Sequence, residues 1–207
     1  DRHHTVEAYA AAKRRVFENQ GAADVAVVNA DDEPAMALSA GTVATRRLFS
    51  RRSAIDAGTV IESGWVVERV GGRSERLVPL DAVQLIGEHL IDDVMAAATV
   101  AHIAGADSAA MTRALRGFRG LEHAMELVAE FGGVRFVNDS KATNVEAAVR
   151  SIESFQAGVV AIVGGKFKGG DLRLLRSPIG GRGKAVVAIG EAKPLVRAAL
   201  EDVIPVH

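Results

Sequence analysis

Four polar residues in a row, Asn138 to Lys141, directly follow a short apolar run, Val134 to Val137. The apolar run predicts a buried strand, and Thr143 or Asn144 can cap a helix that follows. A polar loop between the carboxyl end of a strand and the start of a helix is where open α/β sheets bind ligands. The alternative is a capped turn whose polar residues bond only to one another.

A second loop, Gly164 to Asp171, combines four glycines with Lys166 and Lys168. Glycines let backbone amides approach an anion and lysines add positive charge, so this loop is a candidate anion site. It follows the apolar run Val159 to Val163, and we therefore expect it at the same sheet edge as the loop Asn138 to Asn144. A flexible turn with solvated lysines is the alternative. The chain contains no Walker A sequence.

The third candidate is Lys13, four residues after Tyr9 and three before Val16. The apolar spacing here predicts a helix from Thr5 to about Asn19 that carries Lys13 on its apolar face. Such a lysine is either a packed stem with a solvated head or an amine held uncharged near a cleft. An uncharged amine can react with carbon dioxide to give a carbamate, an oxygen ligand that suits Mg²⁺.

The elements that position these residues predict an α/β protein with two domains, 1–117 and 118–207. In the first, Asp24 to Asn29 predicts a strand, and the period-two patterns from Thr42 to Leu80 predict a small antiparallel meander appended to the sheet. Helices follow up to Phe118. In the second, a hairpin precedes alternating strands and helices, which predict a Rossmann-like parallel sheet.

Composition excludes several classes of function. The chain of 207 residues has a formal net charge of −1, which argues against a nucleic-acid surface. It has no cysteine, which excludes disulfides and thiolate metal sites. No run of about 18 apolar residues is present to span a membrane. We expect a cytoplasmic monomer that binds neither nucleic acid nor membrane.

Three separated stretches resemble, in the right order, the members of the Mur ligase family that add D-glutamate. They are Asp1 to Asn19, Gly120 to Asn144 and Gly164 to Asp171. The string Asp139-Ser-Lys-Ala-Thr-Asn144 is the most specific part. Related folylpolyglutamate synthases share the architecture but usually lack this string.

The resemblance implies the latter part of a central ATPase domain, followed by a C-terminal glutamate-ligase domain truncated at its C-terminal end. The implied reaction is ATP-driven amide formation in peptidoglycan synthesis, and so in cell-wall formation, cell shape and cell division. ATP phosphorylates the carboxylate of UDP-N-acetylmuramoyl-L-alanine, the amine of D-glutamate attacks, and phosphate leaves.

The resemblance also assigns roles to individual residues. Lys13, as a carbamate, would help to hold Mg²⁺ and position the acyl phosphate. Lys168 would bind the carboxylate of D-glutamate. Asp139 would contact the ribose of the nucleotide, and His89 and Asn144 would contact the nucleotide as well. Lys141 and Thr143 would line the junction between the nucleotide and the incoming amino acid. Lys141 would also be a catalytic residue.

Three replacements depart from the family pattern. Ala124 stands where the family usually has arginine, and Leu90 and Asp93 replace the two asparagines of an HNxxN motif. They remove a phosphate contact and a purine contact. These replacements favour a non-catalytic relative that is used for binding, whereas the retained Lys13, Lys141 and Lys168 oppose that interpretation. A third interpretation is another amino-acid ligase, such as a folylpolyglutamate synthase. Because the UDP-binding domain and the phosphate loop are absent from the chain, we expect this fragment alone to be inactive.

Overall fold

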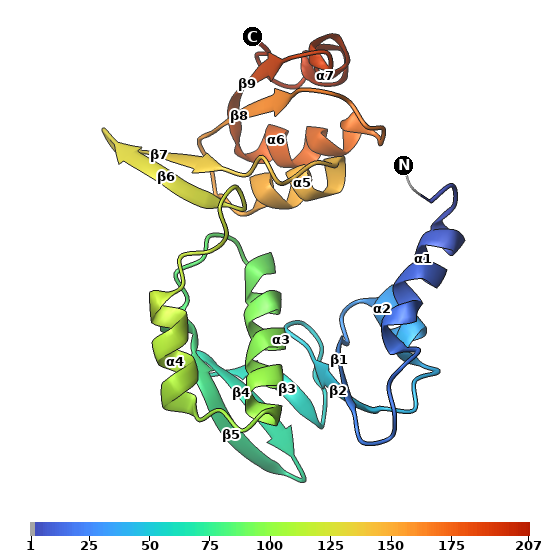
Figure 1. Ribbon diagram of the computed structural model, residues 1–207. Helices are drawn as coiled ribbons and strands as arrows, with labels where there is room; N and C mark the ends of the chain where they lie inside the picture. Colours follow the sequence, from blue (N-terminus) through green and yellow to red (C-terminus); the bar gives the residue numbers. More distant parts are fainter. Residues whose placement is uncertain (1–2) are drawn as a thin grey trace. The chain divides into compact units, whose positions relative to one another are not determined.

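The computed structural model describes residues 3–207, which form two compact units (Figure 1). Unit 1 comprises the residues up to Gln84 together with Leu90–Phe118, and unit 2 comprises Leu85–His89 together with Arg119–His207. Asp1 and Arg2, which begin the first of the three resembling stretches, lie outside the described residues. Within residues 3–207, no helix is both long enough and apolar enough to cross a membrane.

Unit 1 is built on a five-stranded mixed sheet with the strand order β1-β2-β3-β4-β5. Its strands are β1 (Val25–Asn29), β2 (Thr45–Phe49), β3 (Gly58–Glu62), β4 (Trp65–Val70) and β5 (Arg73–Pro79). The α/β class is therefore confirmed, but the meander is not an appendage. Strand β2 is parallel to both β1 and β3, and only β3, β4 and β5 run antiparallel. The period-two pattern of β2 is common to parallel and antiparallel edges, so it could not reveal the direction of pairing.

The helices of unit 1 are α1 (Val6–Arg14), α2 (Glu33–Ser39), α3 (His89–Ile103) and α4 (Ser108–Gly117). Polar side chains cap the N-termini of α1, α2 and α4. The Oγ1 of Thr5 accepts the Ala8 amide at 3.1 Å and so caps α1 as predicted. The helix is shorter than predicted, because its last turn tightens to a 3-10 helix at Arg15–Phe17, and no residue of α1 is buried.

A buried polar network fixes α3 on the sheet. The hydroxyl of Thr59 in β3 lies 2.6 Å from the carboxylate of Glu68 in β4 and 2.7 Å from the hydroxyl of Thr99 in α3. All three side chains are buried, and Thr99 also donates to the carbonyl of Met95 at 2.7 Å. Because a buried polar group without a partner is costly, this network specifies one position of α3 along the strands.

Unit 2 has two separate two-stranded sheets. They consist of β6 (Glu126–Phe131) with β7 (Val134–Asn138), which are antiparallel, and β8 (Val159–Gly164) with β9 (Gly183–Ile189), which are parallel. Helices α5 (Val145–Glu153), α6 (Arg176–Arg182) and α7 (Lys193–Leu200) complete the unit, with a 3-10 turn at Leu172–Leu175. Val206 continues the parallel pairing as a single bridge to Val186.

The predicted hairpin is confirmed, but the prediction that Val134 to Val137 is buried is wrong. Val134 is 55% exposed and Phe136 is 53% exposed. Among residues 3–207, strand β7 pairs only with β6, and none of its residues belongs to the buried core of unit 2. An apolar run of this length does not distinguish a covered strand from an uncovered one.

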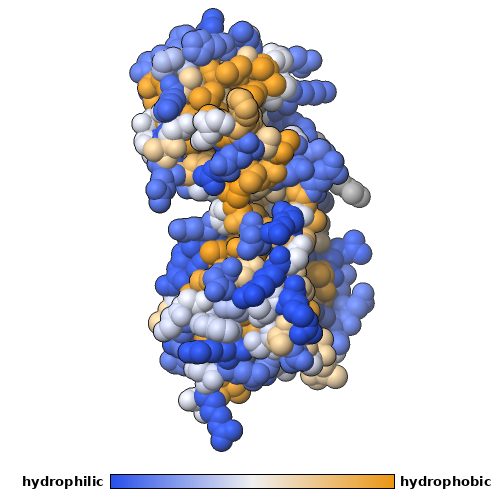
Figure 2. Space-filling view, turned by 90° about the vertical axis from the view of Figure 1, so that its left-hand side faces the viewer, coloured by the Kyte–Doolittle hydropathy of each residue, from blue (hydrophilic) through white to orange (hydrophobic). Residues whose placement is uncertain are grey.

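The core of unit 2 lies on one face of the β8–β9 sheet. Val186 and Ala188 of β9 are buried there with side chains from α5, α6 and α7, and Ala161 and Val163 of β8 pack against them. The side chains that alternate with these on β8 are exposed, with Ile162 70% accessible. Figure 2 accordingly shows hydrophobic residues over part of the surface of unit 2. The core holds α5 and the loops around it in place.

Candidate nucleotide and substrate site

The loop Asn138–Asn144, called loop 138–144 below, is fixed through the carboxylate of Asp139. Oδ1 of Asp139 accepts the Met125 amide at 3.0 Å, and Oδ2 accepts the Ser151 hydroxyl of α5 in a short hydrogen bond. The Asp139 carbonyl accepts the Ala142 amide at 2.9 Å. Asp139 is only half-buried, so its carboxylate still faces solvent and can accept a further donor.

The turn His123–Met125 contacts loop 138–144 and has strained backbone angles. His123 and Met125 have φ values of 66° and 48°, in the left-handed region that residues other than glycine rarely adopt. The His123 carbonyl accepts the Lys141 amide at 3.0 Å, and Nδ1 of His123 lies 2.8 Å from Nδ2 of Asn138. Ala124, the replaced arginine position, therefore lies within a turn that contacts the Asp139 carboxylate.

The other predicted residues of loop 138–144 divide into a cap and two exposed side chains. Oδ1 of Asn144 accepts the Ala147 amide at 2.7 Å, so Asn144 is the N-cap of α5, and the choice left open between Thr143 and Asn144 is settled. Lys141 and Thr143 are exposed. Their side chains are accessible to a ligand, whereas the side-chain oxygen of Asn144 is engaged by the helix.

His89 joins the same region of unit 2 from a distant part of the sequence. Its Nδ1 lies 3.4 Å from the hydroxyl of Ser154, which directly follows α5. Gly87 makes this approach possible, because a Cβ there would lie 2.6 Å from the Ser154 hydroxyl. The structure thus brings His89 and Asp139 to one helix, through serines three residues apart.

The loop Gly164–Asp171, called loop 164–171 below, packs beside the start of α5. A Cβ on Gly170 would lie 3.0 Å from Val145, and one on Gly164 would lie 2.0 Å from the Ile189 carbonyl, so both positions require glycine. Phe167 packs against the core of unit 2, while Lys168 is exposed. The two candidate loops are therefore neighbours, although β7 and β8 belong to different sheets.

The last residue of loop 164–171, Asp171, forms an ion pair with Arg173. The guanidinium of Arg173 donates to both carboxylate oxygens of Asp171, at 2.8 Å and 3.1 Å from Nε and 2.8 Å from Nη2. These bonds and the Arg173 amide hold the pKa of Asp171 below its ordinary value. Asp171 therefore stays charged and bound to Arg173, which leaves Lys168 as a cation for an external anion.

Lys13 belongs to unit 1. It is exposed on α1, and its Nζ lies 5.3 Å from the centroid of the Tyr9 ring. The ring of Tyr9 is also 5.7 Å from that of His3. A cation over an aromatic face is attracted to the ring, so this contact orients the Lys13 side chain along the helix.

The described residues do not form a complete metal site. Among residues 3–207, no three side chains of His, Cys, Asp or Glu come together as a group that could hold an ion. A carbamate on Lys13 would add one carboxylate-like group. The residues present therefore do not by themselves fit a Mg²⁺ ion.

Two acidic residues at the carboxyl end of β1, Asp31 and Asp32, have structural partners. Oδ1 of Asp32 accepts the Ala35 amide at 2.9 Å and caps α2. Asp31 instead binds the turn after β2, where its carboxylate accepts the hydroxyl of Ser50 at 2.7 Å and the amide of Arg51 at 2.8 Å. This carboxylate locks the ends of two neighbouring parallel strands together.

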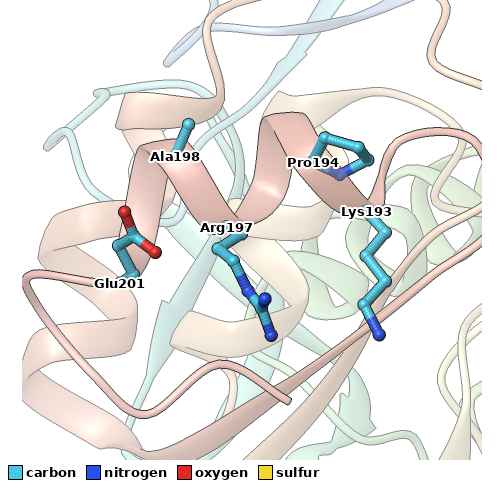
Figure 3. A pocket seen from close by; sticks show the side chains of 5 residues that line it. All are labelled: Lys193, Pro194, Arg197, Ala198 and Glu201. Atoms are coloured by element: carbon cyan, nitrogen blue, oxygen red, sulfur yellow. The ribbon is translucent and has the colours of Figure 1, made fainter.

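A shallow hollow of about 390 Å³ lies along α7 (Figure 3). Figure 3 shows the side chains of Lys193 and Arg197 extending to the same side of the helix, with Glu201 one turn further on. None of the predicted site residues lines this hollow. We therefore assign it no part in the candidate site.

Sequence reasoning missed the residues that hold the candidates in place. Ser151 and Ser154 contact Asp139 and His89, and Phe167 anchors loop 164–171. The three-residue spacing of the serines places them on neighbouring turns of α5, which is the one signal the sequence offered. Serines at this spacing are common on exposed helices, so the pattern alone selects no partner.

Residues 1–101 match the Mur ligase middle domain. The chain is 41% identical over 207 residues to the UDP-N-acetylmuramoylalanine–D-glutamate ligase of Acidobacterium capsulatum, covering 99% of this chain and 45% of that protein. It is 39% identical to the protein of the same name from Pelotomaculum thermopropionicum, covering 96% and 44%. The chain thus spans less than half the length of these relatives.

Solved structures share the fold of the chain. The MurF ligase of Thermotoga maritima in complex with ADP superposes with a TM-score of 0.66 at 16% identity, covering 97% of this chain and 47% of that one. A bifunctional folylpolyglutamate synthase/dihydrofolate synthase from Yersinia pestis gives 0.67 at 17%, covering 99% and 48%. At these identities the likeness establishes the fold without separating the two activities. With the sequence match over nearly its whole length, the chain belongs to the Mur ligase family.

Proposed function

We propose that the protein containing this chain is an ATP-dependent ligase that adds D-glutamate to UDP-N-acetylmuramoyl-L-alanine. The observation that carries the proposal is the arrangement around α5. Two candidate nucleotide residues, His89 and Asp139, meet this helix, and the loop that carries Lys168 packs against its first residue. The identity of about 40% to D-glutamate ligases supports this acceptor and amino acid.

Each candidate side chain has a proposed task. Asp139 accepts a hydroxyl of the nucleotide ribose, because its half-buried carboxylate retains free acceptor positions. His89 contacts the nucleotide. The side-chain nitrogen of Asn144 can also contact the nucleotide, because only its side-chain oxygen caps α5. Lys141 and Thr143, both exposed, face the junction with the amino acid. The ammonium of Lys168 pairs with a carboxylate of D-glutamate.

The reaction proceeds in two steps. The carboxylate of UDP-N-acetylmuramoyl-L-alanine attacks the γ-phosphorus of ATP, ADP leaves, and an acyl phosphate forms. The amine of D-glutamate then attacks the acyl carbon, the carbon–oxygen bond to phosphate breaks, and the nitrogen loses a proton. Lys141 and Lys168 contribute by holding anionic groups of the reactants in an attacking geometry.

A carbamate on Lys13 is proposed as one ligand of Mg²⁺, which would neutralise phosphoryl oxygens when bound. Carbamylation of Lys13 would have to displace the contact between its Nζ and the Tyr9 ring. Because the cofactor is ATP and the acceptor a nucleotide sugar, we place the reaction in the cytoplasm, in peptidoglycan synthesis. We propose that the protein acts as a monomer that binds neither nucleic acid nor membrane.

The proposal is tested by phosphate release from ATP in the full-length protein. Release should require both UDP-N-acetylmuramoyl-L-alanine and D-glutamate, and L-glutamate should not replace D-glutamate. Release that instead requires a folate acceptor and L-glutamate would favour a folylpolyglutamate synthase. A protein that binds neither ATP nor the acceptor would be a non-catalytic relative, as the replacements at Leu90, Asp93 and Ala124 favour.

A further inference from the structure

Two serines at the end of α5 contact the two candidate nucleotide residues, one as a hydrogen-bond donor and the other as an acceptor. Ser151 lies against Asp139 from loop 138–144, and Ser154 lies against His89, the first residue of α3. All four residues belong to unit 2. Residues three apart on a helix lie on neighbouring turns of one face, so one rigid element sets both contacts.

Ser151 acts as a donor. Its hydroxyl carries one hydrogen and lies near two acceptors, Oδ2 of Asp139 and the Ala147 carbonyl at 2.9 Å. The carboxylate is the stronger acceptor and the closer one, so the hydrogen goes to Asp139. The amide of Met125 holds the other oxygen at 3.0 Å. Donors from two directions thus fix the plane of this carboxylate.

Ser154 acts as an acceptor toward the histidine. Its hydroxyl donates to the Arg150 carbonyl at 2.9 Å, which uses its only hydrogen. The contact of 3.4 Å with His89 Nδ1 therefore requires the hydrogen on the imidazole. This assigns the Nδ1–H tautomer to neutral His89 and leaves Nε2 as an acceptor for a ligand donor. Gly87, with φ of 108°, gives the two side chains the room to meet.

We propose that Ser151 and Ser154 are positioning residues for a nucleoside triphosphate, Ser151 through the carboxylate of Asp139 and Ser154 through the imidazole of His89. The proposal rests on the use of ATP in the proposed function. It assigns the two serines different effects. Ser151 sets the group that accepts a ribose hydroxyl, whereas Ser154 sets the tautomer and orientation of a group that has no part in ribose discrimination.

The test measures dissociation constants of the full-length protein for ATP and for 2′-deoxy-ATP by titration calorimetry. Ser151→Ala should weaken ATP binding about tenfold, the effect of losing one charge-assisted hydrogen bond, and should reduce the preference for ATP over 2′-deoxy-ATP. Ser154→Ala should weaken both nucleotides equally. Ser177→Ala, at an exposed serine of α6, is the matched control and should change neither constant.

Ser151→Cys keeps the size of the side chain but donates weakly, so it provides the same comparison if Ser151→Ala does not fold. It should also reduce the preference for ATP, while the KM for D-glutamate stays unchanged. Wild-type constants and wild-type preference in the folded Ser151 variants would overturn the proposal, as would equal losses for ATP and D-glutamate. If wild-type protein binds ATP but does not use D-glutamate, the proposed function fails and the positioning role is still decided by these constants.

Discussion

Replacing Asp31 with asparagine should destabilise unit 1 by an amount that depends on pH. The substitution removes the charge and turns one carboxylate oxygen into an amide donor. That donor would face amide and hydroxyl donors of the turn Ser50–Ser53, from which the carboxylate now accepts hydrogen bonds of 2.7 to 3.2 Å. The turn would lose its link to the end of β1, and with it the attachment of Arg51, whose guanidinium donates to Asp92 of α3 at 2.8 Å.

The magnitude follows from the pKa of Asp31. Partial burial raises this pKa, but hydrogen bonds from the Ser50 and Ser53 hydroxyls and from the Arg52 and Arg51 amides outweigh burial and lower it from 3.8 to about 2. A shift of one pKa unit corresponds to about 1.4 kcal/mol, so the whole shift corresponds to roughly 2.5 kcal/mol. Because this carboxylate is partly exposed, solvent screening reduces its contribution to about 1–2 kcal/mol.

The sign of the pH dependence follows from the lowered pKa. A carboxylate whose pKa is lower in the folded state stabilises that state above its unfolded pKa of 3.8, and the stabilisation is lost as the pH falls through about 2. Wild-type protein should therefore be more stable than Asp31→Asn near neutral pH. The difference in unfolding free energy should shrink between about pH 4 and pH 2.

Urea unfolding followed by tryptophan fluorescence measures this difference in the right part of the molecule. Trp65 is the single tryptophan of the chain and lies in β4, in the same sheet as β1. Asp56→Asn, at an exposed acid before β3, is the matched control and should change stability by less than about 0.5 kcal/mol. A difference that stays constant from neutral pH to about pH 2, or no destabilisation at all, would refute the reasoning.

The remaining predictions concern the full-length protein. Lys13→Ala should abolish ligation, and bicarbonate should not restore it. Wild-type protein treated with ¹³C-bicarbonate should show a carbamate signal by NMR that is missing from the variant. Active protein with an unmodified Lys13 would contradict the metal role. Ala124→Arg should lower the Kd for ATP about tenfold or more, measured by calorimetry, since a charge-assisted phosphate contact contributes about 1.5–3 kcal/mol; an unchanged Kd would place the phosphates elsewhere. Lys168→Ala should raise the KM for D-glutamate strongly and that for ATP little, and a larger effect from Lys166→Ala would reverse the assignment of the two lysines.

Local chemistry made several elements predictable from the sequence. The N-cap at Thr5 and the hairpin turn of two glycines before β7 each depend on residues next to one another in the chain. Their geometry is therefore encoded within a few residues. The pairing of β2 was not predictable, because a strand carries the same alternation in parallel and antiparallel sheets.

The exposure of β7 follows the same logic. Its apolar residues predicted burial, yet its only strand partner is β6, and the layer that would cover Phe136 is not formed by residues 3–207. Burial is a property of what packs on a strand from elsewhere in the chain. The apolar residues of a strand therefore show that it can be buried, but tertiary structure decides whether it is buried.

Candidate ligand groups were recognisable because chemistry limits their types, but their supports were not. A carboxylate such as Asp139 can be selected from its loop, whereas Ser151 becomes relevant only once α5 places its hydroxyl against that carboxylate. The same holds for His89, which reaches α5 because Gly87 admits Ser154. Substitutions of the supporting serines should therefore change nucleotide affinity without altering any group that touches the nucleotide, and a search restricted to ligand-contacting motifs would overlook them.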